Sequence, residues 1–410
     1  SWEAILLFLL KMGARRQINS FLRNNVDVLL SHLSQLTRLD LNELETGAHG
    51  DTVNNLFMKL DPLNFLHIRQ NMIRHLIRKR ILEHARLLDD YYMIALDATG
   101  LFHRHHPHCQ HCLISKSKSG AILYSHNVLE AKLITESGLA LSVASEHIEN
   151  ANGDAYDLSK EKEKQDCELK AFKRLAPKIK DAFPQLKICL LMDSLYAAQS
   201  VMDICKEYGW AFIVCFKEGS IPSVYEEFEH LLPLQTENYC TWETKTVKQQ
   251  IHWTTDIEYQ KHTLHLVRCV DHYKTAKEPT NEYKKFLYIT NVKPTIATVR
   301  SIANGAGRQR WKIENQGFNM QKNGGYNLEH VYSENENAAK CLYECLQIAH
   351  TINQLIEKGS LIGDLLKKYG SIKNLTQRLG EAFRFIKIEK ADIAALLEKP
   401  FQIRLQQDSS

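Results

Sequence analysis

The fold is decided by residues 186–216, which read LKICLLMDSLYAAQSVMDICKEYGWAFIVCF. The apolar run at 186–192 is typical of a buried strand, and Asp193 follows it directly. Residues 196–208 have the pattern of a helix closed by Gly209, and 210–216 form another apolar run. Strand, helix and strand in this order predict two parallel strands joined by a right-handed crossover. This stretch therefore predicts an α/β fold whose site lies at the carboxyl ends of its strands.

A further apolar run, YYMIAL at 91–96, predicts another buried strand, and it ends at Asp97. An acid at the end of a buried strand, followed here by Gly100, is a common way to present a metal ligand from a rigid element. It can equally be an aspartate that starts a turn, and the residues alone do not separate the two interpretations. Alternating residues at 121–146 predict an antiparallel pair of strands, and 159–183 predict a charged amphipathic helix.

The chain as a whole predicts a mixed α/β core with helical regions on either side and a β-rich insertion. In the insertion, candidate strands lie at 239–247, 250–258, 262–271 and 285–290. The predicted regions are a helical N-terminal region with possible DNA contact (1–90), the first part of the core (91–219), the β-rich insertion (220–294), the last part of the core (295–357) and a helical C-terminal region (358–410).

Composition indicates a soluble globular protein of two or three domains. The 410 residues are 44% hydrophobic and 24% charged, with a formal net charge of +4 that permits a polyanionic partner without demanding one. Ten scattered cysteines favour reduced thiols over a disulfide framework. The apolar run at 4–10 is too short to span a bilayer, and no signal-peptide pattern is present. A cytoplasmic protein without a membrane segment is expected.

Residues 65–88 predict an amphipathic helix with one basic face. The predicted apolar stripe consists of Ile68, Met72, Leu76, Ile77 and Ile81. The opposite face carries Arg69, Arg74, Arg78, Lys79, Arg80 and Arg86 against a single acid, Glu83. Such a face suits a phosphate backbone, although a solvated face is the more common role and the preferred interpretation here.

Residues 103–112, HRHHPHCQHC, concentrate five histidines and two cysteines. Cys109 and Cys112 have the C-x-x-C spacing of a zinc or redox site. No second C-x-x-C lies nearby and Pro107 marks a loop, so zinc is the less favoured interpretation. The preferred one is an exposed polar connection that could touch DNA.

Residues 308–330, RQRWKIENQGFNMQKNGGYNLEH, predict a helix on which Arg310, Glu314 and Phe318 are spaced by four. As a purely structural helix it would bury Trp311, Ile313 and Phe318, and its Arg310–Glu314 pair would contribute only about 0.3–0.5 kcal/mol. The functional interpretation adds Glu314 to the two aspartates.

Three clustered acids, Asp97, Asp193 and Glu314, would repel one another unless cations neutralised them. Two divalent ions about 3.5–4 Å apart would do so and would hold the attacking and leaving oxygens of a phosphodiester. Oxygen ligands favour Mg²⁺, for which Mn²⁺ is expected to substitute. The predicted DNA-binding residues are Arg308, Arg310, Trp311 and Lys322. Trp311 could stack on an unpaired base or lie in the core, with the core slightly preferred.

These motifs resemble a known family. Asp97 in ALDATG, Asp193 in LLMDS and Glu314 in RWKIEN, followed by GFN and GYNLEH, resemble the IS4-type DDE transposases of bacterial insertion sequences, from about residue 70 to about 350. That family's helix carries a Tyr, Arg, Glu and Lys signature. Arg310 and Glu314 match its spacing, Gly307 stands at the Tyr position, and Lys322 lies one residue later than the signature Lys. The stretch 166–168 also resembles the family, without an assigned role.

The resemblance implies an RNase H-like mixed sheet flanked by helices and a metal-dependent DNA transposase with the three acids as metal ligands. It further implies transposon ends and target DNA as partners, a homodimer on DNA and a nucleoid-associated location. The alternatives are an RNase H-like nuclease that hydrolyses without joining, and an inactive DNA- or zinc-binding relic. The presence of all three acids argues against the relic.

Overall fold

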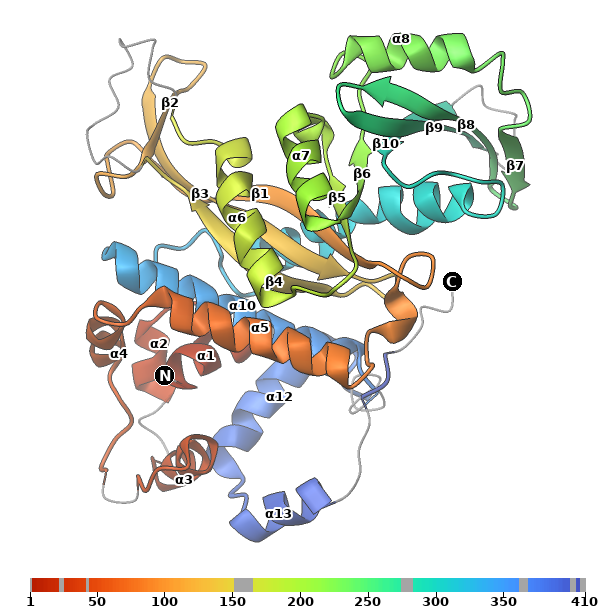
Figure 1. Cartoon of the computed structure of the whole chain (residues 1–410). Coiled ribbons are helices and arrows are strands. Elements are labelled where there is room, and N and C mark those ends of the chain that lie inside the picture. The colour runs from red at the N-terminus through yellow and green to blue at the C-terminus, as the bar shows by residue number, and fades with distance from the viewer. Residues whose placement is uncertain are drawn as a thin grey trace.

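The computed structural model describes residues 2–21, 26–41, 44–150, 165–273, 283–360, 368–398 and 403–405. At its centre is a ten-stranded mixed sheet flanked by helices (Figure 1). The strand order is β2-β3-β1-β5-β6-β10-β9-β8-β7, and β4 pairs with β3 along the same edge as β2, through residues 127–134. The predicted mixed α/β class is therefore confirmed. In the described part of the chain, no helix combines the length and apolar character that a membrane span requires.

The parallel part of the sheet lies at its centre. The strands are β1 (Tyr92–Arg104), β2 (Leu113–Lys116), β3 (Ile122–Ile134), β4 (Ala140–Ile148), β5 (Ile188–Met192), β6 (Ala211–Cys215), β7 (Tyr239–Glu243), β8 (Val247–Tyr259), β9 (His262–Tyr273) and β10 (Tyr283–Thr290). β5 runs parallel to β1 and to β6, and the remaining pairs are antiparallel. The predicted strand, helix and strand of residues 186–216 are confirmed, with Gly209 closing the helix at a φ of 69°.

Helices cover both faces of the sheet (Figure 1). They are α1 (Trp2–Leu9), α2 (Arg16–Phe21), α3 (Val26–Thr37), α4 (Gly50–Phe57), α5 (Pro62–Arg78), α6 (Glu168–Ala182), α7 (Gln199–Tyr208), α8 (Pro222–Leu231), α9 (Asn319–Asn323), α10 (Glu336–Lys358), α12 (Ile372–Phe385) and α13 (Lys390–Glu398). Short 3₁₀ and π segments are η1 (Glu83–Ala85), η2 (Ser194–Tyr196), η3 (Ser301–Ala306), η4 (Gly307–Trp311) and η5 (Ile313–Phe318). The part of the predicted helix 159–183 that precedes residue 165 lies outside the described residues.

Two hydrophobic clusters lie on opposite sides of β1, because side chains alternate along a strand. Met93 and Ala95 belong to a cluster that also contains residues of α1, α10, η3 and η5, which we call the α10-side core. Ile94 and Leu96 belong to the second cluster, together with residues of α6, α7 and α8. The direction of any side chain on β1 therefore follows from its position in this alternation.

The expectation that the first strand ends at Asp97 is wrong. β1 continues to Arg104 because β3 pairs with it along this extension, up to Arg104 opposite Tyr124. β5, by contrast, stops at Met192, so β1 and β3 extend beyond the end of their parallel neighbour.

The β-rich insertion continues the central sheet. After α8, the strands β7 to β10 form antiparallel pairs, and β10 pairs with β6 of the core through Ile289 opposite Val214. The four strands therefore extend the same sheet instead of forming a separate one.

The prediction for the basic helix was wrong at Ile68 and Arg69, whereas Leu76 is buried and Arg78 is exposed as predicted. Ile68, placed in the predicted apolar stripe, is 47% exposed, whereas Arg69, placed on the solvent face, is fully buried. Arg69 fits inside because its guanidinium meets two buried acids, with Nη1 3.7 Å from Glu130 Oε1 and Nη2 3.3 Å from Glu344 Oε2. The periodicity of α5 could not reveal these partners, which come from β3 and α10.

Candidate active site

Asp97 lies on β1, and Asp193 follows its parallel neighbour β5 directly. β1 and β5 pair with Ala95 beside Leu191, and continuing this register by two residues brings Asp97 beside Asp193. Adjacent strands are about 4.8 Å apart. Ala95 and Leu191 both contribute to the α10-side core, so the aspartates two residues further on leave the sheet on that same side.

Asp97 is a partly desolvated carboxylate with one cationic partner. Arg310 donates from Nη1 to Asp97 Oδ2 at 3.0 Å, and the Ala98 amide donates to Oδ1, also at 3.0 Å. Burial raises the pKa of Asp97 above its usual value; Arg310 and the Ala98 amide oppose this, and the nearby charge of Asp193 adds to it. The net upward shift of the pKa means that burial and the charge of Asp193 together outweigh the stabilisation that Arg310 and the Ala98 amide give to the carboxylate.

Asp193 is held in place by the backbone that follows β5. Its Oδ1 accepts a hydrogen bond from the Leu195 amide at 2.9 Å and thereby caps η2. Because this short helix follows the strand immediately, it fixes the position of Asp193 at the end of β5.

Glu168, in the first turn of α6, is a third acid of this site that the sequence did not assign. Burial raises its pKa, and the charges of Asp97 and Asp193 raise it further. The Tyr196 hydroxyl donates to Glu168 Oε2 at 3.3 Å. Its only sequence signal was the family-like stretch 166–168, since spacing alone cannot indicate that the start of α6 approaches two strands.

Glu314 is on the segment that covers the same side of the sheet. η5 packs against β1, β3 and β4, and its Ile313 and Phe318 are fully buried in the α10-side core. Glu314 itself is half-buried, and among the described residues its side chain forms no hydrogen bond or ion pair. The carboxylate oxygens of Asp97, Asp193 and Glu314 do not all lie within 4.8 Å of one another. Among the described residues, only the potential metal ligands His108, Cys109 and His126 are that close together.

Of the helix predicted at 308–330, only the part up to Asn323 is helical, and residues 324–330 form bends and turns. The helical stretch is irregular: from Ser301 it runs as a π segment, a 3₁₀ segment and a second π segment before α9, so four-residue spacing does not define a single face. Two glycines lie at close approaches in this stretch. A Cβ on Gly307 would lie 2.4 Å from the Tyr288 ring, and one on Gly317 would lie 3.0 Å from the Lys132 chain. Interruptions of this π type recur at functional sites.

The four predicted DNA-binding residues have different surroundings. The preference for Trp311 in the core is wrong, because its side chain is 56% exposed, with the Arg310 guanidinium 5.1 Å from the ring centre. Arg308 Nη2 lies 2.6 Å from Oδ2 of the buried Asp271, which ties η4 to β9. Lys322 Nζ lies 3.0 Å from Glu329 Oε1.

The histidine- and cysteine-rich loop lies beyond Asp97, where β1 and β3 extend past β5. Cys109 and Cys112 are free thiols, and both lie against His126 of β3. Cys112 is buried, so the preferred picture of a fully exposed loop is wrong at this position. Burial raises the pKa of Cys109 to about 12 and lowers the pKa of His126 to about 4.

No protein-family model matches this chain, and no curated protein is significantly similar to it.

Proposed function

We propose that this protein is a metal-dependent DNA transposase with an RNase H-like catalytic core, which cleaves and joins strands at the ends of an insertion sequence. The observation that carries the proposal is the pair Asp97 and Asp193, which lie two residues beyond the paired Ala95 and Leu191 of the parallel strands β1 and β5 and are close enough that the charge of Asp193 raises the pKa of Asp97, a shift that comes first from burial. Acids at the carboxyl ends of parallel strands lie where α/β proteins hold their substrates.

Support for an RNase H-like core comes from the strand order. β4, β3, β1, β5 and β6 are neighbours in the sheet, with antiparallel pairing up to β1 and parallel pairing from β1 to β6. α6 connects β4 to β5, and α7 connects β5 to β6. This arrangement fits the core that the resemblance to IS4-type transposases implies.

The donor set suits Mg²⁺ or Mn²⁺. Asp97, Asp193 and Glu168 offer only carboxylate oxygens, which hard divalent cations prefer, and their mutual repulsion is relieved by positive charge. Glu314, on η5, would be a fourth acid that could bind the metal. Divalent cations held there would activate water or a 3′-hydroxyl for in-line attack on phosphorus.

Two residues of the irregular helix would position the DNA. The Arg310 guanidinium, at the edge of the acid group, has the planar fork that suits a phosphate. The exposed Trp311 ring offers a face on which an unpaired base can stack. Since two ends must be joined, we propose that the protein acts as a homodimer on DNA, in the cytoplasm at the nucleoid.

The test uses the DNA that flanks the coding gene as the source of terminal sequences. End-labelled fragments and a target plasmid are incubated with the full chain and Mg²⁺ or Mn²⁺. Asp97→Asn and Asp193→Asn should each lower cleavage by roughly 10³-fold or more while leaving DNA binding intact, because loss of metal-assisted charge stabilisation removes several kcal/mol. Glu207→Gln, an exposed acid on α7, is the matched control.

Glu314→Gln and Glu168→Gln, measured separately, decide which further acid is required. Retained cleavage in Asp97→Asn or Asp193→Asn would reject the proposed site. Cleaved ends that never join the plasmid would identify a nuclease, and DNA binding without any metal-dependent cleavage would identify an inactive relic.

A further inference from the structure

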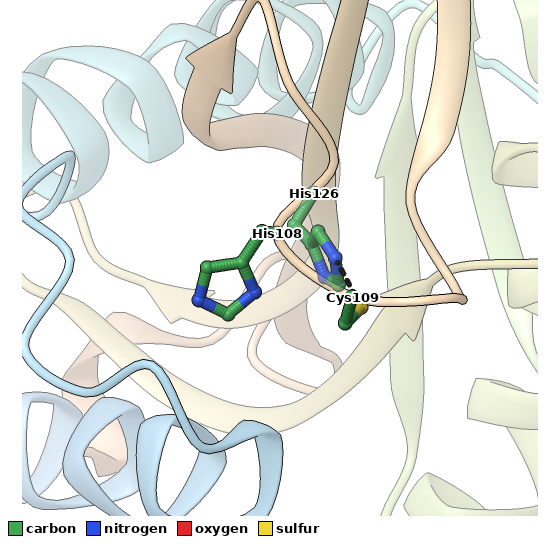
Figure 2. A group of neighbouring side chains, drawn as sticks. All are labelled: His108, Cys109 and His126. Atoms are coloured by element: carbon green, nitrogen blue, oxygen red, sulfur yellow. Dashed lines mark hydrogen bonds between the residues drawn. The ribbon is translucent and has the colours of Figure 1, made fainter.

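A compact group of two sulfurs and two imidazoles lies where the β1–β2 loop meets β3. His126 Nε2 is 3.1 Å from Cys109 Sγ and 3.3 Å from Cys112 Sγ. His108 lies beside them: ligand atoms of His108, Cys109 and His126 all lie within 4.8 Å of one another, a set to which Cys112 does not belong (Figure 2).

Backbone amides already point at both sulfurs. The amides of His108 and Cys109 donate to Cys112 Sγ at 3.3 and 3.4 Å, and the His111 amide donates to Cys109 Sγ at 3.3 Å. Amide donors directed at a sulfur stabilise the negative charge of a thiolate. These amides would therefore support the two thiolates once a metal supplies the positive charge that offsets their burial.

His108 is a buried imidazole with a nitrogen left unsatisfied. Its side chain is only 2% exposed. Nε2 lies 3.2 Å from Glu334 Oε2, which is within ion-pair distance although the two are not aligned as a hydrogen bond. Nδ1 has no hydrogen-bond partner among the residues that the structure describes. Phe102 packs on both imidazoles, with ring centres 4.9 Å from His108 and 5.1 Å from His126, and so fixes their orientation.

We propose that His108, Cys109, Cys112 and His126 form a structural zinc site. Two cysteines and two histidines are a common tetrahedral donor set, in which sulfur and nitrogen ligands lie about 3.5 Å apart. The observed separations of 3.1 and 3.3 Å from His126 Nε2 to the two sulfurs need only a small expansion. On binding, each thiol releases its proton to solvent, and Glu334 orients His108 from Nε2, leaving Nδ1 for the metal.

The site is structural because four protein ligands leave no open position for substrate. It ties the loop between β1 and β2 to β3, on the part of β1 that extends beyond Asp97. Through Glu334, which also pairs with Arg104 at 3.1 Å, it reaches the segment that precedes α10. Zinc would thereby fix the β1–β3 extension next to the acid group, and this role goes beyond the proposed catalytic function.

The test measures metal binding by the full chain, without DNA. The protein is stripped with a chelator under reducing conditions and titrated with Zn²⁺, or with Co²⁺, whose visible absorption reports tetrahedral sulfur coordination. One equivalent should bind. Cys109→Ser, Cys112→Ser and His126→Asn should each weaken binding by roughly 100-fold or more, and Glu334→Gln by about 10–100-fold.

Two matched variants serve as controls. Cys167→Ser removes an exposed thiol outside the group, and His105→Asn removes an exposed histidine of the same loop, so both should bind metal like the wild type. Glu334→Gln leaves all four ligands in place, so it reports on the site even where a ligand variant misfolds. The proposal would be overturned if the wild type bound less than a tenth of an equivalent of zinc, or if His126→Asn bound zinc with unchanged affinity. It would also be overturned if Cys109 and Cys112 formed a disulfide in the presence of zinc.

Discussion

Replacing Arg69 with methionine should destabilise the protein by about 3–5 kcal/mol, the usual cost of breaking a buried ion pair. Arg69 is the central cation of a fully buried group consisting of Arg69, Glu130, Lys132 and Glu344, which we call the buried charge network. It also donates to Ser142 Oγ at 2.7 Å and to Ser145 Oγ at 2.9 Å. Both serines in turn donate to Glu130.

The size of the expected loss of stability depends on which buried charges of the network lose their partner when Arg69 is replaced. Glu130 keeps Lys132, whose Nζ lies 3.2 Å from Oε2, and the Tyr343 hydroxyl at 2.6 Å. Glu344 loses its ion-pair partner while still buried. A chain of this length has an unfolding entropy of about 0.9 kcal/mol/K if it unfolds as one unit, so the expected fall in Tm is about 3–6 °C.

The assay is thermal unfolding at a fixed scan rate, applied to Arg69→Met, Glu344→Met and the double variant. The double variant should lose at least about 1 kcal/mol less than the sum of the single variants, because removing both partners leaves no unpaired charge. Arg78→Met, an exposed arginine on the same helix, should change stability by less than about 0.5 kcal/mol. A Tm for Arg69→Met within 1 °C of the wild type, or strictly additive effects, would refute the reasoning.

Three further predictions concern pH, packing and metal. Burial raises the pKa of Glu344 to about 7, so its contribution to stability is fully present below its unfolded pKa and is lost as pH rises through 7; the Tm of Glu344→Gln relative to wild type should therefore rise between pH 5 and pH 8. Gly307→Ala should lower stability by about 1–3 kcal/mol, because its Cβ would meet the Tyr288 ring, whereas Gly219→Ala, with open space around it, should not; chemical denaturation compares the two. Mg²⁺ should raise the Tm of the wild type in a thermal-shift assay, and Asp193→Asn should have a higher metal-free Tm and a smaller response.

The central strands could be predicted because their signal is local. Apolar runs bounded by Asp193 and Gly209 identify two buried strands and the helix between them, and the structure confirms all three. The extension of β1 beyond Asp97 gave no such signal. It exists because β3 pairs with it as far as Arg104, and that pairing depends on a partner some twenty residues or more along the chain.

The partners of buried polar groups could not be predicted for the same reason. Arg69 was assigned to the solvent by its charge, yet its partners Glu130 and Glu344 come from β3 and α10. His126 and Glu168 were likewise missed, since each reaches its group only through the packing of separate elements. The sequence identified Asp97 and Asp193 because each directly follows a local apolar run, whereas long-range pairing leaves no local signal.

The buried charge network and the group Asp97, Glu168 and Asp193 differ in their balance of acids and bases, and this difference favours a bound cation at the second group. The buried charge network is closed, since its two acids are matched by two bases within the protein. Among the described residues, Asp97, Glu168 and Asp193 instead have one ion pair with a base, that of Asp97 with Arg310, and burial together with the charges of Asp97 and Asp193 raises the pKa of Glu168. The fold therefore matches its buried acids with bases in equal number but leaves a surplus of negative charge at Asp97, Glu168 and Asp193, which the proposed divalent cation would offset. The same surplus is the reason that removing Asp193 should stabilise the metal-free protein while abolishing cleavage.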